Sequence, residues 1–209
     1  MANDRYHASG VQAQWQPGSE GLVLRNKQGI SNTEEINRAE LELLHQLYEY
    51  LLKGELPDRR LRVADIKQWH ALWLGNLYDW AGQVRMVNMS KGSFQFAAAP
   101  QIPRLLDEFE RSCLRNYTPC HGLSQSAVAE AIAICHVELI LIHPFREGNG
   151  RISRLLADVM AVQAGLEPLD YSVWDADREI YFSAIQNGMG RDYEPMYELV
   201  SRALTSERT

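Results

Sequence analysis

One apolar stretch constrains this chain more than any other feature. Residues 127–142 are apolar on nearly every side of a helix, with Ile140, Leu141 and Ile142 at the end of the run. A helix that is apolar all round belongs in the core of a folded domain. Pro144 disfavours the helical conformation at His143, so the core helix must end there. The sequence therefore predicts a helical domain built around this segment.

Helical spacing of apolar residues predicts further helices on both sides of the core helix. Asn32 or Thr33 can cap a helix that Gly54 and Pro57 end. Gly and Pro residues punctuate the remaining helical segments. These are expected at residues 63–77, 101–116, 124–142, 150–164, 175–187 and 193–204.

Between residues 80 and 100 the apolar period changes to two. Val84, Met86 and Asn88 should face one way, and Arg85 and Val87 the other. After the break at residues 90–93, two phenylalanines alternate again at positions 94 and 96. Such a pattern predicts a small β-hairpin. The expected fold class is mostly α with one hairpin.

The chain divides into three parts by composition. Residues 1–32 are polar, with apolar anchors at Trp15, Val23 and Leu24, and we expect an arm that packs on the domain. Residues 33–204 form the domain itself, and residues 205–209 form a short C-terminal tail. The 209-residue length suits one domain with such an arm.

Composition limits the classes of partner. The formal charge is −6, from 21 basic and 27 acidic side chains, which argues against a nucleic-acid partner. The most apolar part of the core helix, residues 131–142, is interrupted by His136 and Glu138 and is too short to span a bilayer, so we expect no membrane contact. The N-terminus has no apolar secretory core. Three cysteines without CxxC spacing (Cys113, Cys120 and Cys135) predict neither a disulfide framework nor a zinc site, and favour the cytoplasm.

The residues after the core helix carry the chemistry. His143 is held at a helix C-terminus, which favours positive charge and should make its imidazole a better proton acceptor. Gly148, Asn149 and Gly150 precede a new helix, and the N–H groups of a first helical turn can bind an anion. Arg151 and Arg154 come next. They lie on one face of that helix, although cations oppose the dipole there. A bound polyanion explains both arginines.

A carboxylate beside phosphates repels them unless a hard cation lies between, so Glu147 predicts Mg²⁺ held with a nucleotide. The residues alone thus indicate a nucleotide–Mg²⁺ site beside a histidine base. Simpler interpretations remain open. Glu147 and Arg151 could form only a surface ion pair. His136 and His143 could share a metal, although a hydrogen-bonded core histidine is the simpler interpretation of His136. Lys91 could be a solvated turn residue, and tryptophans 69, 73 and 80 fit core packing.

The segment His143-Pro144-Phe145-Arg146-Glu147-Gly148-Asn149-Gly150-Arg151-Ile152-Ser153-Arg154 matches the Fic family motif at every defined position. Trp80-Ala81-Gly82-Gln83-Val84-Arg85 and the residues after it resemble that family's active-site flap. The resemblance extends over about residues 20–200. It implies a Fic-type helical bundle with one small β-hairpin flap.

What the resemblance implies for activity is AMP transfer from ATP to a Ser, Thr or Tyr hydroxyl of a target protein, with release of pyrophosphate. His143 would be the base, Phe145 the core anchor of the loop, and Glu147 the Mg²⁺ ligand. Gly148, Asn149 and Gly150 would form the anion hole. Arg151 would contact the distal phosphates, and Arg154 the γ-phosphate. The flap would dock an extended target segment, with Val87, Asn88, Met89, Ser90, Lys91 and Gly92 as its candidate residues. Adenine is expected near Tyr181 and Gln186.

One motif position separates subclasses of the family. The kinase-like Doc branch carries lysine where this chain has Gly150, so the resemblance favours AMP transfer. Transfer of another phosphate-containing group, including phosphorylation, and a non-catalytic nucleotide-binding regulatory module are the alternatives. The family's inhibitory helix motif, (Ser/Thr)-x-x-x-Glu-(Gly/Asn), has only near matches, ending at Glu35 and Glu130. We therefore expect inhibition by a separate small, antitoxin-like protein.

Overall fold

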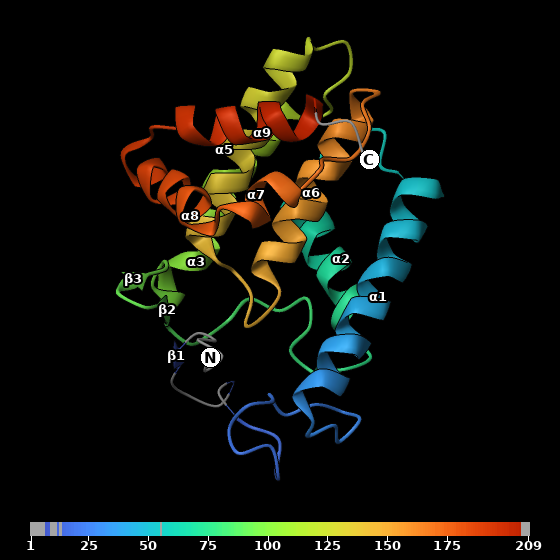
Figure 1. Cartoon of the computed structure of the whole chain (residues 1–209), viewed down its shortest axis with the longest axis vertical. Coiled ribbons are helices and arrows are strands. Elements are labelled where there is room, and N and C mark those ends of the chain that lie inside the picture. Colours follow the sequence, from blue (N-terminus) through green and yellow to red (C-terminus); the bar gives the residue numbers. More distant parts are fainter. Residues whose placement is uncertain (1–6, 9–11, 13, 55, 206–209) are drawn as a thin grey trace.

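The computed structural model describes residues 7–8, 12, 14–54 and 56–205, and these are mostly helical (Figure 1). The helices are α1 (Thr33–Lys53), α2 (Val63–Leu74), α3 (Ile102–Phe109), α4 (Arg115–Tyr117), α5 (Gln125–Ile142), α6 (Asn149–Gln163), α7 (Ser172–Ala176), α8 (Arg178–Asn187) and α9 (Glu194–Thr205). The strands are β1 (His7–Ala8), β2 (Met89–Lys91) and β3 (Phe94–Gln95). The predicted mostly α class with one hairpin is confirmed. The last tail residues, 206–209, lie outside the described residues.

Helix α5 is the core of the protein. It packs against α6 and α9, and Figure 1 shows it in the middle of the helical body, with α1 along one side and the hairpin toward the other. The whole helix is long and apolar enough to cross a membrane, although residues 131–142 alone were expected to be too short. Most of the helix is buried inside the protein. Ser124 caps its start by accepting a hydrogen bond from the Ala127 amide.

Helix α1 begins and ends where its capping residues predict. The Asn32 side chain accepts hydrogen bonds from the amides of Glu34 and Glu35, and Gly54 follows the last turn. Its apolar stripe is buried against the domain (Ile36, Leu47 and Leu51). Glu40 lies in the same stripe and is also fully buried, which no helix-propensity argument explains.

Three predicted helices differ from the observed ones. The second ends at Leu74 rather than near residue 77. The predicted helix 101–116 is interrupted by a π-helical turn at Glu110–Leu114. The predicted helix 175–187 is two helices, because the Asp177 side chain caps a new start by accepting from the Ile180 amide.

The hairpin is shorter than the alternating pattern suggests. Burial alternates as predicted, since Arg85 and Val87 are buried while Met86 is exposed, but the strand begins only at Met89. The sheet has the order β1-β2-β3 with antiparallel pairs. In the arm, Val23 and Leu24 are buried as expected, whereas Trp15 is 41% exposed.

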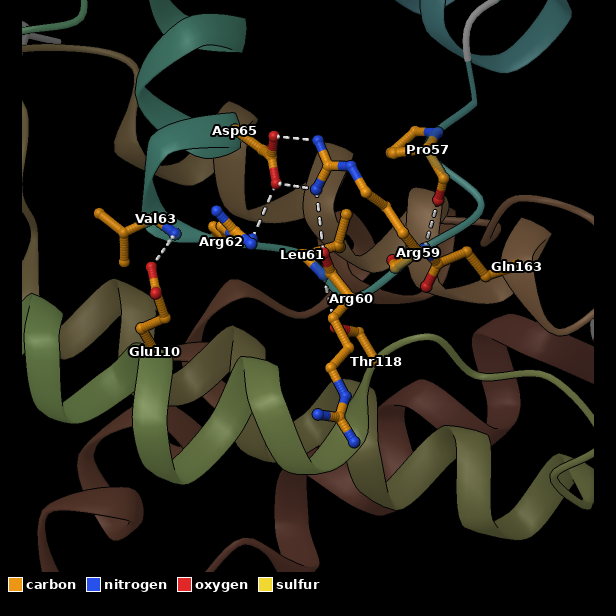
Figure 2. Close-up of polar contacts among 10 residues, drawn as sticks. All are labelled: Pro57, Arg59, Arg60, Leu61, Arg62, Val63, Asp65, Glu110, Thr118 and Gln163. Atoms are coloured by element: carbon orange, nitrogen blue, oxygen red, sulfur yellow. Dashed lines mark hydrogen bonds and ion pairs between the residues drawn. The ribbon is translucent and has the colours of Figure 1, made fainter.

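The connection between α1 and α2 is fixed by hydrogen bonds to distant helices (Figure 2). Gln163 Nε2 of α6 donates to the carbonyl oxygens of Pro57 and Arg59, at 2.6 and 3.0 Å. The Leu61 amide donates to the Thr118 hydroxyl oxygen at 2.8 Å. Because α2 lies directly after this connection, these bonds help to hold α2 in place beside α6.

Candidate active site

The motif residues surround one cavity of about 510 Å³. A volume of this size is typical of small-molecule sites. Its walls come from three separate segments: the motif loop and α6, the hairpin, and α8. The lining residues include His143, Glu147, Gly148, Asn149, Gly150, Arg151 and Arg154 from the motif, Lys91, Gly92, Phe94 and Phe96 from the hairpin, and Tyr181, Phe182 and Gln186 from α8.

His143 forms the end of α5 and turns the chain into the motif loop. Its backbone is left-handed (φ 51°, ψ 61°), so the helix ends at this residue, and the following proline disfavours the helical conformation there. Its Nδ1 lies 3.2 Å from the Ile140 carbonyl oxygen, which can only accept, so Nδ1 carries the hydrogen. Nε2 is therefore the proton-accepting nitrogen of the neutral ring.

Burial governs the titration of His143. The side chain is 2% exposed, and this burial, with the positive charges of Arg85 and Lys91 adding to it, lowers its pKa to about 3. The expectation that the helix end would raise its proton affinity is therefore wrong, because desolvation of the charged ring outweighs the helix dipole. The imidazole is neutral at pH 7, as a general base must be.

Phe96 of the hairpin covers the catalytic candidate, and the sequence alone did not identify it. Its ring stacks on the His143 imidazole with a centroid distance of 3.7 Å. The alternation of Phe94 and Phe96 indicated a strand, but nothing in that pattern placed the second ring over a histidine 47 residues further along the chain.

Arg85 fixes the turn that carries His143. It is 1% exposed, and its Nε donates to the His143 carbonyl oxygen at 2.6 Å while its backbone amide donates to the Pro144 carbonyl oxygen at 2.8 Å. Its other guanidinium nitrogens donate to the carbonyl oxygens of Val87 and Ala97 in the hairpin. Burial lowers the pKa of this guanidinium to about 10, so it stays charged at neutral pH. A single buried cation thus ties the hairpin to the motif loop.

His70 of α2 holds the same loop from the opposite end. Its Nδ1 accepts a hydrogen bond from the Gly82 amide at 2.8 Å, so Nε2 carries the hydrogen and donates to the Glu147 carbonyl oxygen at 3.0 Å. Phe145, buried as predicted for a core anchor, stacks on this ring with a centroid distance of 3.9 Å.

The glycine turn has two different parts. Gly148 has φ +80°, and a Cβ there would lie 2.5 Å from the Trp73 ring. Gly150 has nothing within 4 Å of its Cβ position and faces the cavity. Asn149 lines the cavity, but its side chain binds both the amide and the carbonyl oxygen of Phe145, so it braces the loop.

Glu147 is the one carboxylate among the described residues that line this cavity. Its Oε1 accepts from the Gly148 amide at 3.1 Å and lies 3.3 Å from Arg151 Nη2. One protein carboxylate next to an anion-binding turn is the donor set with which Mg²⁺ is bound together with substrate phosphates, so the residues present fit such an ion. The described residues contain no group of three or more candidate metal ligands.

The two motif arginines lie on one face of α6, as predicted, and both have acidic partners. Arg151 Nη2 lies 2.9 Å from Oε2 of Glu40 on α1, in addition to its contact with Glu147. Arg154 makes two hydrogen bonds to Asp175 of α7, at 2.8 and 3.3 Å. Neither partner was predicted. The sequence did offer a signal for Glu40, which is an acid within the apolar stripe of α1. No sequence signal pointed to Asp175.

The predicted flap residues divide between packing and the cavity. Val87 and Met89 are buried, and the Asn88 side chain accepts from the Ala99 amide. Only Lys91 and Gly92 of the six line the cavity, and Lys91 Nζ lies 3.7 Å from the centroid of the Phe182 ring on α8. Ser90 pairs with His7 of β1 on one side and with Gln95 of β3 on the other.

The simpler interpretations hold for several other residues. His136 is a buried core histidine, hydrogen-bonded to the Tyr181 hydroxyl at 2.8 Å and close to the Ser153 carbonyl oxygen. The tryptophans at positions 69 and 73 are core residues, and the one at position 80 packs against the core. All three cysteines are free and buried. Glu35 and Glu130, the near matches to the inhibitory motif, are exposed.

Comparison with known proteins agrees with this geometry. Residues 60–161 match the model of the Fic/DOC family. A probable protein adenylyltransferase, y4lH of Sinorhizobium fredii, is 29% identical over 87% of this chain and 91% of its own length. The protein adenylyltransferase VbhT of Bartonella schoenbuchensis is 28% identical over 88% of this chain, which covers only 37% of VbhT.

A solved structure shares the fold. The BepC protein of Bartonella tribocorum, crystallised with bound AMPPNP, superposes with a TM-score of 0.73 at 23% identity, covering 88% of this chain and 93% of that one. Motif, cavity and fold agree with the match of residues 60–161 to the Fic/DOC family model.

Proposed function

We propose that this protein is an adenylyltransferase that moves AMP from ATP to a Ser, Thr or Tyr hydroxyl of a target protein and releases pyrophosphate. The observation that carries the proposal is the single cavity that joins the neutral His143 to the glycine turn and to both motif arginines. The names of y4lH and VbhT, and the AMPPNP bound to BepC, support it.

The proposed step begins with His143. Its Nε2 accepts the proton of the target hydroxyl as the hydroxyl oxygen attacks the α-phosphorus of ATP. The bond between the α-phosphorus and the oxygen that bridges to the β-phosphate breaks, and its electrons leave with pyrophosphate. Bound phosphates favour the imidazolium form, so nucleotide binding raises the pKa of His143 from its low value in the free protein.

The remaining motif residues hold the triphosphate. The amides of the glycine turn and the guanidinium groups of Arg151 and Arg154 bind its oxygens. Glu147 would hold Mg²⁺, and the charge this ion supplies would stabilise the leaving group. Tyr181 and Gln186 line the part of the cavity formed by α8, where we place the adenine.

We place the target along β3 of the hairpin. Within the part of the chain that the structure describes, β2 has a strand on each side, whereas β3 is the last strand of the sheet. An extended target segment that pairs with β3 would run beside Phe94, which lines the cavity. A separate inhibitory protein remains our proposal for restraint. A sharp rise in automodification of the Glu35→Gly variant would instead identify Glu35 as an internal brake.

The test is intact-protein mass after incubation of the purified chain with ATP, Mg²⁺ and a cell lysate. A gain of one AMP on a target supports the proposal. A phosphate-sized gain supports the kinase-like alternative, and nucleotide binding without an adduct supports a regulatory module. The His143→Ala variant should lose transfer by at least about 100-fold while its ATP affinity stays nearly unchanged. His121→Ala, which changes an exposed histidine, is the matched control and should transfer normally.

A further inference from the structure

We propose that Glu40 is a positioning residue for Arg151: a buried acid on α1 that holds the guanidinium in the orientation in which it meets the distal phosphates of the nucleotide. This inference rests on the proposed function and adds to the motif a residue from a helix more than 100 positions earlier in the chain.

Glu40 is fixed by contacts to its carboxylate and to its backbone. The side chain is 0% exposed, and its Oε1 accepts a hydrogen bond from the Tyr78 hydroxyl at 2.6 Å. Its backbone carbonyl oxygen accepts from Trp73 Nε1 at 2.8 Å. These bonds leave Oε2 facing Arg151 Nη2 at 2.9 Å.

The charge of Glu40 makes this contact persistent. An ionised carboxylate without a cation is costly to bury, and Arg151 supplies the guanidinium within ion-pair distance. Arg151 is 33% exposed, so it reaches from the buried acid to the solvent-accessible cavity. The Trp73 ring lies 4.6 Å from its Cζ and covers one face of the guanidinium. Because Nη2 is ion-paired and one face of the guanidinium is covered, Arg151 has little freedom to reorient.

Glu40 contacts Arg151 from outside the cavity in which the nucleotide would bind. Arg151 and Glu147 line the cavity, whereas Glu40 does not. Both acids contact the same nitrogen, Nη2. A guanidinium has five N–H donors, so Nε and Nη1 remain as donors to phosphate oxygens. Glu40 therefore orients the guanidinium before the nucleotide binds. It does not compete with phosphate, because a competing acid would have to lie in the cavity.

The experiment compares ATP and AMP binding by calorimetry in the presence of Mg²⁺. Glu40→Gln keeps the volume of the side chain but removes its negative charge, so the ion pair with Arg151 is replaced by, at most, a weaker neutral hydrogen bond. We expect ATP to bind about tenfold more weakly to this variant. AMP affinity should stay within about twofold, because AMP lacks the distal phosphates that Arg151 meets. General damage to the fold would weaken both ligands.

Two further variants separate positioning from stability. Tyr78→Phe removes a hydrogen bond that helps to orient the same carboxylate but keeps its charge, so it should lower the melting temperature and change the ATP-to-AMP affinity ratio less than Glu40→Gln does. In an Arg151→Gln background, Glu40→Gln should have no further effect on that ratio, because the residue through which Glu40 acts is already absent.

A second readout needs no nucleotide. Side-chain NMR of ¹⁵N-labelled arginine should show slow rotation of the Arg151 guanidinium in the wild type and faster rotation in Glu40→Gln, with Arg151→Lys giving the assignment. Unchanged ATP affinity in Glu40→Gln, or tighter ATP binding, overturns the positioning role, and so does unchanged guanidinium rotation. A wild type that binds no ATP overturns the proposed function instead, and the rotation measurement then decides the role of Glu40 alone.

Discussion

Arg151 and Arg154 lie one helical turn apart on α6, yet the acids that hold them differ. Glu40, the partner of Arg151, is 0% exposed, whereas the side chain of Asp175, the partner of Arg154, is 50% exposed. Arg154 itself is 26% exposed and lies over the rings of Tyr171 and Trp174, so the two pairs differ in the exposure of the acid and not of the arginine. An ion pair with an exposed carboxylate exchanges more readily and contributes less to stability than one with a buried carboxylate, which is costly to break. The contrast teaches that one side of the cavity is fixed by the protein interior and the other is open to exchange.

The two glycines of the turn repeat this contrast in the backbone. Gly148 packs against Trp73, a core residue on the same side of the site as Glu40, whereas the space beside Gly150 is open. The fixed side should therefore respond to substitution with lost stability, and the open side with altered ligand binding.

The largest effect is expected at the glycines. Gly148→Ala places a Cβ 2.5 Å from the Trp73 ring at a residue with φ +80°, and should cost about 3 kcal/mol of unfolding free energy or more. Gly150→Ala should change that free energy by only about 0.5 kcal/mol, in the stabilising direction, and should weaken ATP binding by crowding the cavity. Urea unfolding and calorimetry measure both. Equal destabilisation by the two variants would contradict the division of the site.

The arginines should differ in the same sense. Arg151→Leu leaves the buried Glu40 carboxylate without its cation and should cost about 3 kcal/mol. Arg154→Leu leaves a carboxylate that water can reach, and should cost less than about 1 kcal/mol. Urea unfolding of the two variants at pH 7 is the measurement. Similar losses would show that the burial of the partner does not set the strength of the pair.

The sequence predicts the open parts of this site better than the fixed ones. The motif identified His143, Glu147 and both arginines as neighbours because they are close in the chain, and local rules for glycine and proline fix that loop. The core helix was equally clear, since its apolar residues cover every face. The predicted ion pair of Glu147 and Arg151 is present, but the prediction was incomplete, because Arg151 also contacts an acid on α1.

The residues that fix the site from a distance could not be placed in advance. Glu40, His70, Arg85 and Phe96 lie 47 to 111 residues from their partners in the motif. Their roles follow from tertiary packing, which periodicity does not encode. The same lack of tertiary information led to the wrong expectation for His143, whose titration is governed by its burial and not by the helix end.

A smaller effect of opposite sign to that of Glu40→Gln is expected from Asp175→Asn. Loss of the exposed carboxylate frees Arg154 for phosphate, so ATP should bind about threefold more tightly. Glu179→Gln is the matched control, because it removes one exposed acid from the neighbouring helix α8. Calorimetry with ATP and AMP measures the change. Weaker ATP binding in Asp175→Asn would make Asp175 a positioning residue and remove the distinction between the two arginines.

The smallest effect concerns the titration of Asp175. Its hydrogen bonds to Arg154 hold the pKa of its carboxyl below the usual 3.8, so the pair contributes its stability above pH 3.8 and loses it as the pH falls through the lower folded-state value. Carboxyl ¹³C NMR should show this pKa rising toward 3.8 in Arg154→Leu and staying low in Arg151→Leu. Because the two arginines share one helix face, a rise in both variants would mean that they act on Asp175 as one charge cluster, and the separation of a fixed from an exchangeable side would not hold.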